Sequence, residues 1–197
     1  MNKFLILMYH MISKPETTEE VKYACPPENL DRHMQKLIHN GFNPVSLEQI
    51  EQHLLSNVNL PKNSVAITFD DGFADNYTHA FPILTKHQIP ATVFLASGCM
   101  ESTNHWMTQR GLPTRKMLNW QQIREMDKYN IAFGAHTVTH PKLPELDTES
   151  ATYEIASSKK TVEDNLGKAC KHFAYPYGLF NSENRDAVES SGFTLAC

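Results

Sequence analysis

Six short apolar segments punctuate this 197-residue chain, and the stretches between them have the periodicity of amphipathic helices. Several segments are apolar nearly throughout, which is typical of strands covered on both faces. Strands that alternate with helices form right-handed βαβ units, so the sequence predicts an α/β protein with a parallel sheet or barrel, as one domain over residues 1–197. The segments are Lys3–Tyr9, Ser64–Phe69, Ala91–Ala96, Ile131–Ala135, His172–Tyr175 and Phe193–Ala196.

Capping residues mark several helix ends. Ser46 is followed three residues later by Gln49, which predicts a helix that opens with a capping box. Asn119 is the predicted N-cap of a second helix. Gly41 and Gly167 each follow an apolar periodic stretch and are expected to end a helix.

The longest stretch without clear periodicity runs from Ser97 to Leu118. Loops of this length inside a compact domain are usually functional. We therefore expect this loop to form a rim or lid over a site, and His105 is the histidine within it.

The charge distribution excludes one class of partner. The chain has 18 Lys and Arg against 22 Asp and Glu, for a net charge of -4, without a block of either sign. Nucleic-acid binding needs clustered basic side chains, so it is not expected.

The apolar run at residues 4–8 is too short to span a membrane, and no small-residue cleavage site follows it. It is expected to be a buried strand, and no membrane span is expected. If Met1 is the native start, the cytoplasm is the expected compartment. If a leader was removed, the expected place is the cell surface or the medium.

Polar clusters follow four of the predicted strands. The carboxyl ends of parallel strands open on one face, where the active sites of βα proteins are built. We therefore expect these clusters, which are distant in sequence, to converge. They are His10, Asp70-Asp71-Gly72, His136-Thr137-Val138-Thr139-His140 and Tyr175-Pro176-Tyr177-Gly178.

The combination of residue types indicates metal-assisted hydrolysis of an amide or ester. His136 and His140 are four residues apart, a spacing that points two imidazoles the same way on a helical turn. Two histidines and one carboxylate form the ligand set of a catalytic zinc site that leaves a position for water. Consecutive residues of an extended segment point to opposite sides, so one of Asp70 and Asp71 can bind the metal while the other acts as general base. His10 is the candidate acid for the leaving amine.

The same residues form the motifs of a known family. Residues 68–72, Thr-Phe-Asp-Asp-Gly, resemble the first motif of the polysaccharide deacetylases, the NodB homology domain of carbohydrate esterase family 4. Residues 136–141 resemble the second motif, H-[S/T]-x-x-H, and residues 175–178 resemble the third. Order and approximate spacing agree over nearly the whole chain. The resemblance implies a distorted, incomplete (β/α)7 barrel that removes acetyl groups from N-acetylated sugars.

The resemblance also implies a role for each matched residue. Asp70 corresponds to the catalytic base, and Asp71, His136 and His140 correspond to the ligands of a divalent metal ion, for which Zn²⁺ is expected. Tyr177 corresponds to the residue whose backbone N–H holds the oxyanion. The residues expected to contact an N-acetylated glycan are Trp120, Tyr175 and Pro176.

Two departures from the family pattern point to one branch. Ala174 stands where many members have an Arg that would lower the pKa of the catalytic base. The chain ends at Cys197, before the segments that supply the acid histidine in many members, so the domain is expected to be short at its C-terminus. Residues 7–12, 27–30 and 174–178 resemble the poly-β-1,6-N-acetylglucosamine deacetylases, whose acid histidine comes from the N-terminal strand, where His10 lies.

Three functions are consistent with these motifs. The first is removal of N-acetyl groups from a polysaccharide that contains N-acetylglucosamine, which requires an open groove with exposed aromatic side chains. The second is hydrolysis of a small amide or ureide, for which the loop from Ser97 to Leu118 would close over a pocket. The third is a sugar-binding module that has lost turnover, although the intact Asp and His residues argue against it.

Overall fold

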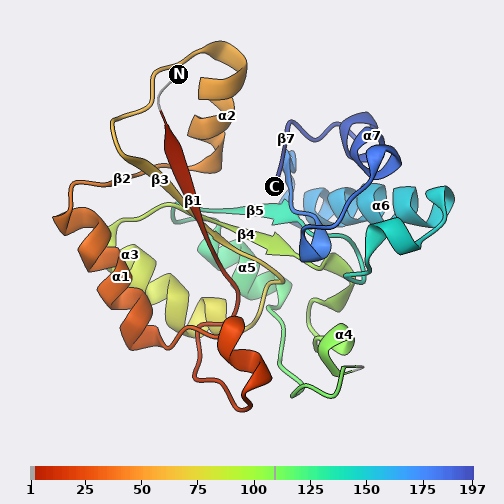
Figure 1. The fold of residues 1–197 in the computed structure, drawn as a ribbon, viewed down its shortest axis with the longest axis horizontal. Coiled ribbons are helices and arrows are strands. Elements are labelled where there is room, and N and C mark those ends of the chain that lie inside the picture. Colours follow the sequence, from red (N-terminus) through yellow and green to blue (C-terminus); the bar gives the residue numbers. More distant parts are fainter. Residues whose placement is uncertain (1–2, 109) are drawn as a thin grey trace.

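The computed structural model describes residues 3–108 and 110–197 and consists of one parallel sheet with helices around it (Figure 1). The strand order is β1-β3-β4-β5-β6-β7, β2 pairs with the start of β3, and every pair is parallel. The sheet curls into a half-barrel, which confirms the expected fold class. The strands are β1 Phe4–Tyr9, β2 Asn43–Pro44, β3 Ser64–Phe69, β4 Ala91–Leu95, β5 Ile131–Ala135, β6 His172–Phe173 and β7 Leu195–Ala196.

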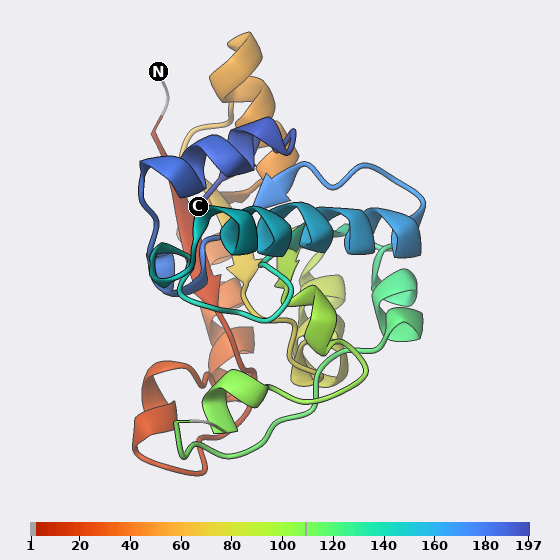
Figure 2. The ribbon, with the colours of Figure 1, turned by 90° about the vertical axis from the view of Figure 1, so that its right-hand side faces the viewer.

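The helices cover the outside of the curl. Helices α1 and α3 lie side by side, as do α6 and α7 (Figures 1 and 2). Short turns precede or follow the strands at η1 Glu19–Lys22, η2 Asn76–Ala80, η3 Ser97–Cys99, η4 Leu143–Glu145 and η5 Pro176–Gly178. The α-helices are α1 Pro27–His39, α2 Leu47–Ser56, α3 Phe81–His87, α4 His105–Thr108, α5 Trp120–Met126, α6 Thr148–Leu166 and α7 Ser182–Ser190.

The predicted helix ends are confirmed. Ser46 and Gln49 form a reciprocal capping box at α2, and Asn119 forms one with Gln122 at α5. Gly167 ends α6 in the left-handed conformation, with φ +66°. These ends were predictable because each depends on hydrogen bonds between residues a few positions apart.

The prediction that the first strand is buried is wrong. In β1, Leu5, Ile6 and Met8 are 50%, 38% and 60% exposed. The reason is that β1 lies at one open edge of the curl and β7 at the other. A run of apolar residues indicates a strand, but it does not show whether a neighbouring strand covers it.

The core lies against the two central strands, where β3 and β4 are buried along their whole length. Gly134 in β5 allows the close packing at this point. A Cβ atom there would lie 2.5 Å from Cδ1 of Phe94 and 2.8 Å from the carbonyl oxygen of His172. Both distances are shorter than real Cβ contacts, so any side chain at this position would force the ring or the backbone to shift.

Replacing Gly134 by Ala is therefore expected to destabilise the fold by about 1–3 kcal/mol through overpacking. Urea unfolding followed by circular dichroism would measure the loss. Gly167→Ala is the control, because nothing lies within 4 Å of its Cβ position and only the cost of a positive φ remains. A Gly134→Ala variant with the same free energy of unfolding as wild type would contradict the packing argument.

Candidate active site

The Asp-Asp-Gly turn lies where β3 ends. The backbone N–H of Asp70 still pairs with the carbonyl oxygen of Tyr9, so Asp70 continues the strand next to β1. Asp71 has φ +76° and Gly72 has φ +85°, so the chain turns sharply after Asp70. The turn, rather than the alternation expected for an extended strand, gives the two carboxylates different surroundings.

The loop that carries His136 and His140 is irregular, although their spacing predicted a helical turn. Thr137 and His140 have φ +65° and +62°, which a right-handed helix excludes. Glu154 of α6 holds the loop instead: its carboxylate accepts hydrogen bonds from the backbone N–H groups of Val138 and Thr139 at 2.7 and 2.9 Å. Together with a local hydrogen bond from the His140 backbone N–H to Oγ1 of Thr137 at 3.0 Å, this longer-range contact fixes the loop that carries the two imidazoles. Residue spacing alone cannot reveal it.

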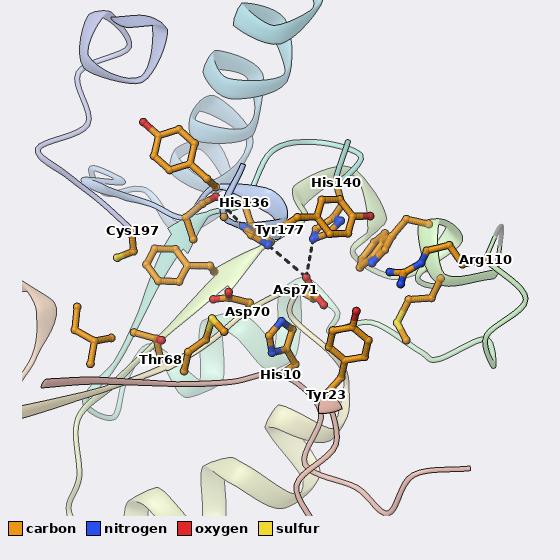
Figure 3. Close-up of a pocket in the computed structure, with 18 residues that line it drawn as sticks. His10, Tyr23, Thr68, Asp70, Asp71, Arg110, His136, His140, Tyr177 and Cys197 are labelled. Carbon is orange, nitrogen blue, oxygen red and sulfur yellow. Dashed lines mark hydrogen bonds and ion pairs between the residues drawn. The ribbon is translucent and has the colours of Figure 1, made fainter. Parts of the chain in front are cut away.

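Asp71, His136 and His140 come together as a possible metal site. Asp71 Oδ1 lies 3.4 Å from Nε2 of His136 and 3.1 Å from Nε2 of His140, and all three side chains are buried. One ligand atom from each lies within 4.8 Å of the others. Figure 3 shows the three groups pointing at one another.

The surroundings of the three groups fit a divalent cation. Within the described residues, Asp71 Oδ1 is buried without a hydrogen bond of good geometry, so this oxygen remains available to bind another partner. Burial alone would raise the pKa of Asp71, but the His140 and His136 side chains hold it below its usual range, so the group is a carboxylate. The Nδ1 atom of His136 lies 2.7 Å from the carbonyl oxygen of Ala174 and donates to it, which leaves Nε2 as the ligand atom.

Asp70 is 8% exposed and lines the same cavity without belonging to the triad. Burial raises the pKa of Asp70, and the charges of His136 and His10 oppose this rise. Ala174, which replaces the Arg of many family members, contributes only its backbone carbonyl. Histidine side chains are thus the groups that oppose the rise in this chain, which has Ala174 at the position of the family's arginine.

His10 follows β1 and lines the cavity from the side opposite the histidine loop (Figure 3). Its ring packs against Tyr23, with 5.5 Å between centroids. Its carbonyl oxygen accepts a 2.8 Å hydrogen bond from Nδ2 of Asn76, a buried residue on the turn after the Asp-Asp-Gly segment. The same turn that follows the aspartates thus fixes the backbone of His10.

The cavity has a volume of about 500 Å³ and is lined mainly by apolar and aromatic side chains. The Trp106 ring stacks on His140 at 4.5 Å, and the Tyr177 ring packs edge-on at 4.7 Å. Tyr177 has φ +59°, so the third motif also turns through the left-handed region at the site.

Not every residue selected from the sequence lines this cavity. His10, Asp70, Asp71, His136, His140, Tyr175 and Tyr177 do, whereas Trp120 and Pro176 do not. Trp120 is half-buried against the core at the start of α5.

Sequence reasoning missed several lining residues. Trp106 and Arg110 lie in the loop from Ser97 to Leu118, so that loop does form one wall, as expected. Tyr23 comes from the segment after β1, and Ile6, Met8 and Cys197 come from the two open edges of the sheet. The absence of periodicity marked the loop, but no local signal marked the individual residues.

A buried ion pair holds two walls of the site together. Glu20 is 0% exposed and accepts hydrogen bonds from Nε and Nη2 of Arg115 at 3.0 and 2.6 Å. It joins the segment that carries Tyr23 to the loop from Ser97 to Leu118. Burial would raise the pKa of Glu20, but Arg115 and the Glu16 backbone N–H lower it below its usual value.

Acid is expected to weaken the fold through this pair. The pKa of Glu20 is lower in the native state than its unfolded value of about 4.3, so its contribution is complete above that pH and is lost as the pH falls through the native pKa. Glu20→Gln should lower the free energy of unfolding at neutral pH by about 1–3 kcal/mol. Urea titrations from neutral pH to about pH 3 should show the gap between variant and wild type closing. A gap independent of pH would contradict this assignment.

No helix in the described ranges, 3–108 and 110–197, has the length and apolar character needed to cross a bilayer.

A family profile and several known proteins match this chain. The polysaccharide deacetylase profile matches residues 57–196. The Bacillus subtilis protein YxkH is 29% identical over 193 residues, which are 98% of this chain and 63% of YxkH. The poly-beta-1,6-N-acetyl-D-glucosamine N-deacetylase of Staphylococcus aureus is 26% identical over 211 residues, covering 97% of this chain and 70% of that protein.

A solved structure has a fold similar to that of this chain. The Streptococcus pyogenes deacetylase PplD in complex with acetate has a TM-score of 0.82 and 29% identity, and the match covers 98% of this chain and 81% of that one. The chain thus spans less than two thirds of YxkH and a larger share of the solved relative.

Proposed function

The chain belongs to the polysaccharide deacetylase family, and from this membership we propose that it is a metal-dependent hydrolase that removes N-acetyl groups from an N-acetylglucosamine polysaccharide. The observation that carries the proposal is the buried Asp71, His136 and His140 triad beside a second, separate carboxylate. A β-1,6-linked polymer is the first candidate substrate, because the Staphylococcus aureus relative is named for it.

Each step of the hydrolysis has a residue of this chain near it. Asp71, His136 and His140 would hold the cation, for which we propose Zn²⁺, and a bound cation would supply Lewis acidity at the acetyl carbonyl and the attacking water. Asp70 takes a proton from that water as general base.

The tetrahedral oxyanion needs a donor, and the backbone N–H of Tyr177 is assigned that role. His10, on the opposite side of the cavity, gives the proton that the leaving amine requires. Water adds to the carbonyl, the C–N bond breaks, and acetate and the free amino sugar leave.

A second cavity supports a polymer rather than a small molecule. It has a volume of about 880 Å³ and shares Tyr23, Trp106, Arg110, His140 and Tyr177 with the first. The loop from Ser97 to Leu118 therefore borders two adjoining spaces instead of closing over one. Neighbouring sugars of a chain could occupy both.

Acetate release from β-1,6- and β-1,4-linked N-acetylglucosamine oligomers, measured side by side with the zinc-loaded protein, tests the proposal. Wild type should release acetate, and His10→Ala should slow turnover more than it raises KM. If neither oligomer is hydrolysed and a small ureide or formamide is, the small-molecule activity replaces this proposal. If no amide is hydrolysed while oligomers still bind after chelation, the chain is a binding module.

A further inference from the structure

Arg110 has an unusual position in the wall of the cavity. It lies in the loop from Ser97 to Leu118, and its guanidinium points between the hydroxyl ends of Tyr23 and Tyr177 (Figure 3). Burial would raise the pKa of Tyr23, but the neighbouring Arg110 and Lys22 side chains lower it. The guanidinium thus lies beside two phenols (Figure 3), and Arg110 is an exposed residue of the cavity lining.

The charge of Arg110 is not matched within the described part of the chain. Arg115, five residues further on, pairs with Glu16 at 2.8 Å and with Glu20 at 2.6 Å. No ion pair joins Arg110 to any carboxylate of residues 3–108 and 110–197. The loop therefore contains two arginines of different kinds: Arg115 forms a structural ion pair, and Arg110 has no carboxylate partner among the described residues.

Arg110 also lies on the wall that the two cavities share. Lys142, which lines the second cavity, pairs with Glu145 at 2.9 Å, so Arg110 is the lining arginine or lysine without a carboxylate partner in the described ranges. A sugar placed for deacetylation at Asp70 and Asp71 would have its neighbour at this wall. A guanidinium between two hydroxyl groups is suited to planar or tetrahedral oxyanions, which it binds through two parallel N–H donors.

We propose that Arg110, with the hydroxyls of Tyr23 and Tyr177, forms a subsite for an anionic substituent on the sugar next to the one that is deacetylated. The substituent is a carboxylate or a phosphate, and the substrate is then an anionic glycan. This inference rests on the proposed deacetylase activity and narrows its substrate class.

The test compares three oligomers of equal length and linkage with zinc-loaded protein: a neutral N-acetylglucosamine oligomer, one with a carboxylate ether on one sugar, and one with a phosphate monoester. Acetate release gives kcat and KM for wild type, Arg110→Gln, Arg110→Lys and Arg124→Gln. Arg124 is an exposed arginine on α5 that lines neither cavity, so it controls for loss of general surface charge.

Wild type should have kcat/KM at least about tenfold higher for one of the anionic oligomers than for the neutral one, mainly through KM. Arg110→Gln should remove that preference, Arg110→Lys should keep part of it, and Arg124→Gln should keep all of it. The better anionic oligomer identifies carboxylate or phosphate.

Equal rates on all three oligomers would overturn the subsite while leaving the deacetylase activity intact. An equal decrease of kcat/KM for all three oligomers in Arg110→Gln would also overturn the subsite, because it would mean that Arg110 contacts sugar hydroxyls. Failure to hydrolyse any of the three would count against the proposed activity. Equilibrium binding of the three oligomers to Asp70→Asn protein then still tests the subsite, since tighter binding of an anionic oligomer that depends on Arg110 supports it and equal binding rejects it.

Discussion

Asp70→Asn is expected to lower kcat for acetate release by about 10²–10⁴-fold, the usual contribution of a positioned general base. The substitution keeps the size of the side chain but removes its ability to take a proton from water. Asp70 does not belong to the triad of possible ligands, so the variant should bind one equivalent of metal, as wild type does. KM should change little, because the carboxylate acts on water rather than on the sugar.

Steady-state kinetics and metal analysis of the same preparation check this result. Asp164→Asn, on the exposed side of α6, is the matched control. It accounts for effects of preparing a variant protein and of losing one negative charge. If Asp70→Asn kept wild-type kcat, the assignment of the base would be wrong. If it lost the metal as well, Asp70 would be a ligand and the roles of the two aspartates would have to be exchanged.

Removal of a triad member should abolish both metal binding and turnover. In His140→Ala, the cation would keep only Asp71 and His136, and the affinity should fall by more than the roughly 10–100-fold that the loss of an outer-shell partner causes. Asp71→Asn should behave in the same way, because an amide oxygen is a weaker ligand than a carboxylate.

Metal content after gel filtration, and activity before and after chelation, measure the effect. Wild type should contain one equivalent, lose activity with chelator and regain it with Zn²⁺, whereas His140→Ala should not regain it. His39→Ala, at the exposed end of α1, is the matched histidine control. Retention of one equivalent by His140→Ala would exclude this triad as the metal site.

The parts of the fold that were predictable from the sequence depend on neighbours in the chain. The bounds of β3 and β5, the capping box of α2 and the N-cap of α5 agree with expectation, because apolar runs and caps are local signals. The two-residue strand β2 and the short helices α3 and α4 had no comparable signal and were missed.

The candidate site divides in the same way. The motif residues could be brought together in advance, because each follows a parallel strand and such strands end on one face. The residues of the aromatic and cationic walls could not be predicted, because packing between loops places Trp106, Arg110 and Tyr23. The backbone conformation of the loop that carries His136 and His140 was also not predictable, because it depends in part on Glu154, which is 14 residues beyond His140 in sequence.

The left-handed backbone at Asp71, Thr137, His140 and Tyr177 has a consequence for the evolution of this chain. At Thr137, His140 and Tyr177 this conformation raises the energy of the native state by about 1–2 kcal/mol compared with a glycine in the same place, and the cost is smaller at Asp71 because aspartate tolerates the left-handed region better. Selection for heat resistance alone should therefore enrich glycine or asparagine at these four positions. Selection for turnover should remove the same substitutions from Asp71 and His140, whose side chains are the proposed metal ligands, so the two pressures act in opposite directions at these two motif positions.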